Sequence, residues 1–361
     1  MASLPLDPAN DFVEDEAPLA AEGLMLQDIL SGRNLAEMME ESELNSIGQD
    51  VIRDVEIDDS SRGDFLERNE RNIKIAMQVC EEKTTPWPGA ANAKSPILTV
   101  ASIQFNAEAY PIICDGSNLV KGRVLGPDPD GQKRQRADRI GQHMTWQLLY
   151  RMPGWEEETD KLLLMLPITG CVFRKTWYDR IENANRSEIV SGEDFIINND
   201  AKSIETAPRY TQILHYYPYE VREKVVAGEW LEVPLDDEDT RDDEQALGEY
   251  YEQHRCLDLD EDGYPEHYVV TCTKEGRVAR IVPCFGPENI TVKNMAAGHP
   301  GLPPELQGET ILLSKLLEMG GIELAGDIVK ITRRQYFTKY GFIPSPDGSF
   351  YDIGFGDLLE N

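Results

Sequence analysis

The sequence lacks the short motifs by which many enzymes are recognised. Its 361 residues contain no G-x-x-x-x-G-K-[ST], no G-x-G-x-x-G and no G-x-S-x-G pattern. These patterns form phosphate-binding loops, dinucleotide-binding turns and the turns that carry a nucleophilic serine. The usual grounds for ATP hydrolysis, dinucleotide chemistry or α/β-hydrolase chemistry are therefore missing. We expect a protein that is not an enzyme, with no catalytic residue and no cofactor.

Cysteine and histidine are few and are not spaced for metal binding. No pair of the six cysteines has C-x-x-C spacing, and the five histidines form no metal-spaced pair. His254, His267 and Cys256 could meet across a predicted hairpin and hold zinc, but ordinary polar strand positions are the simpler interpretation. Most cysteines lie among apolar residues, which is typical of buried thiols in a reducing compartment.

Long apolar runs are also missing. No stretch approaches the roughly 20 apolar residues that a membrane span requires. The N-terminus has neither the basic region nor the apolar region of a signal peptide. We therefore expect a soluble protein with no membrane partner.

Basic residues are scarce, since 35 Lys and Arg stand against 66 Asp and Glu and give a formal net charge of −31. The acidity is regional, because residues 1–62 and residues 231–266 each carry a net charge of −13. We interpret both stretches as solvated acidic segments. A charge of this size opposes close association with the phosphates of nucleic acids.

The hydrophobic pattern changes its period along the chain, which predicts an α+β fold. The expected helices span 62–82, 95–113, 132–151, 155–166, 218–228 and 310–319. The expected strands span 170–178, 195–197, 210–215, 250–258, 268–273 and 277–283, with a mixed or strand-like stretch at 327–340. Residues 1–61 show only weak helical patterns, and we expect an acidic, disordered arm there.

One acidic stretch matches the first half of an EF-hand loop. Asp258, Asp260 and Asp262 stand at the first, third and fifth loop positions, and Gly263 stands at the sixth. The twelfth position, which should supply a bidentate glutamate, is Val269. We interpret the stretch as an acidic turn that closes a hairpin, not as a metal site.

Two basic clusters are candidate contacts to another subunit or to DNA. The first is on the predicted helix 132–151, where Arg136 and Arg139 share a face. The second comprises Lys330, Arg333 and Arg334, on a predicted strand. The simpler alternative for both clusters is a solvated helix face and a solvated strand edge.

Five groups of residues, in this order along the chain, resemble the portal proteins of tailed phages. The first is WPGAANAKSPIL at 87–98 with AEAYP at 107–111, and the second is GCVFRKTWY at 170–178. The third is EDFIINN at 193–199 with APRY at 207–210, and the fourth is EQHRCLDLDEDGY at 252–264 with HYVVT at 267–271. The fifth is YFTKYGFIPSPDGSFYDIGFGDLL at 336–359.

This resemblance implies a structural role. Portal proteins form a ring of about a dozen subunits at one capsid vertex, through which double-stranded DNA passes during packaging and ejection. The ring binds terminase, the capsid, and tail or head-completion proteins. The resemblance implies a helical wing base with a β-rich insertion over 62–285, and a mixed stem and clip segment that starts at 286–361 and is truncated. The implied location is the virion, with assembly in the host cytoplasm.

Two alternatives stay open from the sequence. An acidic metal-dependent hydrolase or nuclease would use Asp258, Asp260, Asp262 and Glu266. A monomeric acidic interaction protein would bind its partner through residues 1–61. In the portal interpretation, the acidic and basic segments of neighbouring subunits would pair across a head-to-tail interface.

Overall fold

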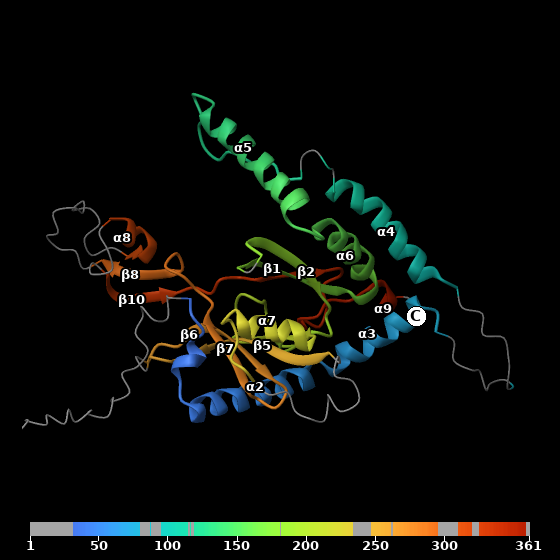
Figure 1. The fold of residues 1–361 in the computed structure, drawn as a ribbon. Coiled ribbons are helices and arrows are strands. Elements are labelled where there is room, and N and C mark those ends of the chain that lie inside the picture. Colours follow the sequence, from blue (N-terminus) through green and yellow to red (C-terminus); the bar gives the residue numbers. More distant parts are fainter. Residues whose placement is uncertain are drawn as a thin grey trace, which may run out of the picture.

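The fold is α+β, with helices packed around three antiparallel sheets (Figure 1). The structure is a computed structural model of the chain. It describes residues 32–79, 87, 95–114, 116, 119–180, 182–233, 247–260, 263–294, 310–319 and 325–358. Within these residues, no helix has the length and apolar character to cross a bilayer.

The helices and strands follow one another in a mixed order. The helices are η1 (Leu35–Met38), α2 (Glu41–Ser61), α3 (Gly63–Ala76), α4 (Ile97–Ile113), α5 (Gln132–Trp146), the π-helical turn η2 (Gln147–Arg151), α6 (Trp155–Thr169), α7 (Pro218–Val226), α8 (Leu313–Met319) and α9 (Phe355–Leu358). The strands are β1 (Cys171–Asp179), β2 (Ala184–Val190), β3 (Phe195–Ile196), β4 (Tyr210–Tyr216), β5 (Gly248–Leu257), β6 (Glu266–Thr273), β7 (Val278–Pro283), β8 (Ile290–Asn294), β9 (Thr310–Leu312), β10 (Ala325–Ile331) and β11 (Phe337–Gly341).

Strand pairing groups the strands into three sheets. The largest has the order β3-β4-β5-β6-β7, and the other two have the orders β11-β1-β2 and β10-β8-β9. The first five residues of β1, 171–175, are buried, and their side chains alternate between two packed faces. Val172 packs against α4 and α6, whereas Phe173 joins an aromatic core shared with the five-stranded sheet.

Most elements predicted from the pattern are confirmed, and the exceptions have physical causes. Strands β2 and β8 were not predicted; β2 (ANRSEIV) is mostly polar and pairs with β1 through its backbone. Helix α6 continues through Pro167 to Thr169, beyond its predicted end at residue 166. The predicted helix at 310–319 divides into a short strand, β9, and α8.

The prediction of a disordered arm over residues 1–61 is wrong for the part that the structure describes. Residues 41–61 form one continuous helix, α2, which packs with η1 against the five-stranded sheet. Leu35 and Val51 have no exposed surface. Helix α2 comes so close to the turn between β6 and β7 that glycine is required at the contact. A Cβ on Gly48 would lie 1.7 Å from the carbonyl oxygen of Gly276.

The acidic residues of α2 are not all solvated, which corrects the interpretation of the first acidic segment. The carboxylates of Asp54 and Asp58 are buried on the side of α2 that faces the sheet. Arg209 on the approach to β4 pairs with Asp58 at 2.9 Å and with Asp54 at 3.2 Å, and Arg255 of β5 pairs with Asp54 at 3.4 Å. These charges therefore join α2 to the sheet.

The expected division at residue 286 also differs from the structure. Strands β8, β9 and β10 form a small sheet with α8, but the chain then returns to the body. Strand β11 pairs with β1 from Cys171 opposite Gly341 to Lys175 opposite Phe337. Tyr351 then stacks on Phe65 of α3. Residues 337–358 are thus part of the same core as β1 and α3.

The junction between α2 and α3 depends on one buried arginine. Arg62 is 3% exposed and donates hydrogen bonds to the carbonyl oxygens of Gly192, Glu193 and Phe195. Its Nε also donates to Asp59 at 2.8 Å. The planar guanidinium can satisfy these acceptors together, whereas a lysine ammonium cannot span them.

We expect Arg62→Lys to lower the free energy of unfolding by about 2–3 kcal/mol, because buried carbonyls lose their donor. The measurement is urea unfolding followed by circular dichroism. Arg53→Lys is the matched control, because Arg53 also pairs with an aspartate three residues earlier but is 65% exposed. It should change stability by less than about 0.5 kcal/mol. Equal effects of the two substitutions would contradict this account.

Candidate functional site

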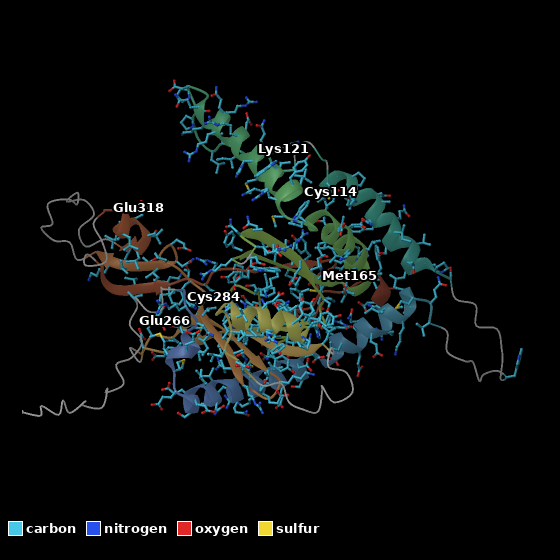
Figure 2. The ribbon with its side chains drawn as sticks, in the orientation of Figure 1. Cys114, Lys121, Met165, Glu266, Cys284 and Glu318 are labelled. Atoms are coloured by element: carbon cyan, nitrogen blue, oxygen red, sulfur yellow. The ribbon has the colours of Figure 1, made fainter. Side chains whose placement is uncertain are left out.

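A projecting arm is the most distinctive surface feature of the described residues. Helix α5 extends away from the body, and the extended segment 119–125 lies along it (Figure 1). Lys121 lies in this segment, beside α5 (Figure 2). The two pieces touch closely, since a Cβ on Gly141 would lie 2.6 Å from the carbonyl oxygen of Val120. Asp128 accepts hydrogen bonds from the amides of Lys133 and Arg134 at the start of α5.

The arm is basic in an acidic chain. Residues 119–151 contain seven Lys and Arg against three Asp, whereas the whole chain has a net charge of −31. Arg136 and Arg139 are both exposed on the face of α5 that points away from segment 119–125. Ile140 and Met144, one and two turns after Arg136 along α5, are 47% and 43% exposed. The predicted pair of arginines therefore lies on a surface that is both basic and apolar.

A cavity of about 440 Å³ lies at the base of the arm, where α4, η2 and α6 meet. Its lining combines aromatic and acidic side chains and includes no Lys, Arg or His. The aromatic residues are Tyr110, Tyr150 and Trp155, and the acidic residues are Glu156, Glu157 and Asp160. A π-helical turn such as η2 often marks a functional site. We call this cavity the acidic–aromatic pocket.

Hydrogen bonds hold two of the pocket carboxylates in place. The Tyr110 hydroxyl donates to Glu156, and Asn106 donates to Asp160 at 2.8 Å. The bond to Glu156, together with burial, raises the pKa of Tyr110 to about 12, so that the phenol keeps its proton. Aromatic faces and carboxylates both attract cations, which makes the pocket suited to a guanidinium or an ammonium group.

The second predicted basic cluster is not a single surface. Arg333 donates to the carbonyl oxygens of Ile204, Glu205 and Ala207, and its guanidinium lies 4.8 Å from the centre of the Tyr210 ring. Arg333 therefore makes its described contacts within its own subunit, and its role as a contact to another subunit or to DNA stays a prediction.

The other two members of that cluster remain at the surface. Arg334 pairs with Glu288 of the same chain and is 46% exposed. Lys330 is exposed on β10. Neither residue lies on the arm, so the structure does not bring the two predicted basic clusters together. The role of Lys330 and Arg334 stays a prediction.

The EF-hand-like stretch lies in the connection between β5 and β6. The amide of Gly263 donates to Asp258 at 3.0 Å, and Gly263 has a φ of +86°. Asp262 lies outside the described residues. Within the described residues, Asp260 does not belong to a group of side chains that could hold a metal ion. Across the described residues, no group of three or more His, Cys, Asp or Glu side chains could hold a metal ion.

A buried polar network joins the two larger sheets. The Lys175 ammonium of β1 lies 2.7 Å from both the amide oxygen of Gln212 on β4 and the carboxylate of Glu252 on β5. Burial alone would raise the pKa of Glu252, but the charge of Lys175 and the hydrogen bond to His254 outweigh it and hold that pKa well below its usual range. Glu252 is therefore ionised inside the core.

Three members of this region resemble a catalytic triad in their order. The Cys284 sulfur lies 3.6 Å from His254 Nδ1, and His254 Nε2 lies 3.4 Å from the Glu252 carboxylate. Cys284 directly follows β7 and has no exposed surface (Figure 2). Burial raises the pKa of the Cys284 thiol to about 12 and lowers the pKa of His254. A neutral thiol beside a neutral imidazole in a closed core is a packing arrangement and not an activated nucleophile.

His267 and Cys256 do meet across the hairpin, as the sequence suggested. They are register partners, and the Cys256 sulfur lies 3.1 Å from His267 Nδ1. His254 is directed instead toward Glu252 and Cys284. The cysteines that the structure describes are all unpaired.

Neither the pocket nor the buried network was predicted from the sequence. Two signals were present. Arg174 and Lys175 interrupt an otherwise apolar strand, which indicates buried partners for the charges. Trp155 is followed directly by three glutamates at the start of a helix, which places an aromatic ring and carboxylates together.

Comparison with known proteins gives no identification. No model of a protein family matches the chain, and no curated protein matches its sequence.

We expect Lys175→Met to destabilise the protein by about 3–5 kcal/mol, because it leaves Glu252 charged and unpaired in the core. Lys175→Met combined with Glu252→Leu should recover most of the loss, as measured by urea unfolding. The control is Lys274→Met, since the Lys274–Glu249 pair at the other end of β5 is about 40% exposed. A double variant no more stable than Lys175→Met would refute this role.

Stability should also depend on the protonation of His267. Burial and the charge of Arg333 lower the pKa of His267 in the folded protein, so the unfolded chain binds the proton first as the pH falls. The contribution of neutral His267 to the free energy of unfolding is therefore fully present above about pH 6.5. It is lost as the pH falls from there through the pKa of His267 in the folded protein. Urea unfolding between pH 7 and 5 should show a flatter pH dependence for His267→Gln than for the wild type. Parallel curves would rule this out.

Proposed function

We propose that this chain is a subunit of a phage portal: a structural ring at a capsid vertex through which DNA passes. One observation carries the proposal. A basic arm with exposed apolar residues projects from a chain with a net charge of −31, so one copy offers a surface that another copy can attract. Head-to-tail contacts of this kind form closed rings when the rotation between neighbours is suitable.

The resemblance to portal proteins supports the same function. Its second and fifth stretches, at 170–178 and 336–359, contain β1 and β11, which pair directly. Its fourth stretch contains residues 252–257 of β5 and residues 267–271 of β6, two strands that also pair directly. Segments that resemble the family in sequence order thus belong to one packed body. In this proposal the body is the wing, and the small sheet with α8 lies toward the stem and clip.

The charge also suits a conduit. A strongly basic channel would hold the DNA backbone by releasing counterions, and an acidic subunit repeated around a ring lowers that binding. In this proposal the ring binds terminase during packaging and tail or head-completion proteins afterwards. The chain performs no catalysis, and its place is the portal vertex of the virion.

The test is the mass in solution, measured by light scattering after size exclusion over a range of protein and salt concentrations. We expect a closed species on the order of a dozen times the 40.7 kDa mass of one chain. A strict monomer at every condition would overturn the proposal and favour a monomeric interaction protein. Nuclease or hydrolase activity that a chelator abolishes would favour the metal-dependent enzyme.

A further inference from the structure

We infer that the acidic–aromatic pocket of one copy receives the arm of a second copy, with Arg136 and Arg139 of α5 lying against its carboxylates. This inference rests on the proposed function in taking the partner to be another copy of the chain. It goes beyond that function by naming the two surfaces that meet and the side chains that join them.

Among the described ion pairs, no arginine of the same subunit pairs with the pocket carboxylates. Arg174 lies 5.2 Å from the centre of the Trp155 ring, but its guanidinium donates to the carbonyl oxygen of Trp155 and to the hydroxyl of Thr159. Eleven residues separate Arg136 from Gln147, the first residue of η2, which corresponds to about 16 Å along an α-helix. Arg151 is nearer, but its guanidinium lies 5.8 Å from the centre of the Trp146 ring and is used there. The pocket lining includes no cationic side chain. Its carboxylates therefore remain available to a cation from another molecule.

The two surfaces are complementary in charge. The pocket presents Glu156, Glu157 and Asp160, and three carboxylates outweigh the partial positive charge at the start of α6. Glu157 is exposed. The arm presents two exposed arginines whose planar guanidinium groups suit both carboxylates and aromatic faces. Tyr150, which is 75% exposed, offers such a face at the pocket rim.

The surfaces also match in apolar character. The pocket lining includes Leu148, Leu149 and Met152, and Ile113, three residues after Tyr110 on α4, is 44% exposed. On the arm, Ile140 and Met144 follow Arg136 at four-residue spacing along α5 and are 47% and 43% exposed. Docking would cover apolar groups on both sides while it pairs the charges. Such a mixture of arginine, aromatic and apolar residues is typical of the centre of a protein interface.

The contact is heterologous, because the arm and the pocket are different surfaces. Each copy can give its arm to one neighbour and accept the arm of another. This predicts a result that a symmetric pairing would not give. A copy with a defective arm and a copy with a defective pocket still share one intact contact, so the two variants should pair with each other and stop.

The experiment uses two variants of the full chain, each altered only at exposed positions. The arm variant is Arg136→Glu with Arg139→Glu, and the pocket variant is Tyr150→Ser with Glu157→Arg. Each alone should associate at least about 100-fold more weakly than the wild type, because like charges then face each other. An equimolar mixture should form a one-to-one dimer, seen by light scattering, that weakens as salt is raised.

The matched control for the arm variant is Arg222→Glu with Lys315→Glu. It changes the net charge by the same amount, at exposed positions away from the arm and the pocket. It should assemble as the wild type does. If it is impaired to the same degree as the arm variant, total charge and not the arm is responsible, and the inference fails.

The outcomes separate this inference from the proposed function. If both variants assemble into the same large ring as the wild type, the arm and pocket are not the interface, but the portal function stands. If the wild type forms open chains or dimers that depend on both surfaces, the inference stands and the portal function fails. Two monomeric variants that stay monomeric when mixed would overturn the inference. A wild type that is monomeric throughout would overturn both.

Discussion

The ion pair between Lys175 and Glu252 is the constraint on which the rest of the structure depends. It joins the sheet that contains β1 to the five-stranded sheet, at a point with almost no exposed surface. An ammonium and a carboxylate can remain ionised in such a core only if they stay together. The aromatic cluster of Phe173, Tyr210 and Phe337 packs around this pair. The two sheets are therefore fixed relative to each other, and the helices that carry the pocket and the arm are built on the outer face of β1.

The pattern of apolar residues predicted most of the fold, because regular burial on one face leaves a period in the sequence. Strands β4, β5 and β6 and helices α3 to α6 were found in this way. Helix α2 was not predicted as a packed element, because polar and acidic residues dominate it and two of its aspartates are buried in ion pairs. An aspartate that is buried because it pairs with an arginine far along the chain cannot be recognised from the hydrophobicity of its neighbours in the sequence.

The candidate site was predictable only in part, for the same reason. The shared helix face of Arg136 and Arg139 follows from their spacing, and the structure places both on the exposed side of α5. The inward role of Arg333 could not be predicted, because its three carbonyl partners lie more than 120 residues earlier in the chain. The pocket likewise combines residues of α4, η2 and α6, which only the tertiary fold brings together.

The return of the chain from the small sheet to β1 has a consequence for biosynthesis. During synthesis, β1 emerges from the ribosome well before β11, since about 160 residues separate Lys175 from its register partner Phe337. Until β11 arrives, one edge of β1 has unpaired amides and carbonyls and an exposed Phe173 face. The early chain therefore passes through an incomplete state that can pair with other strands. The body closes only after β11 has emerged, and chains that stop or pause between β1 and β11 would be prone to aggregate.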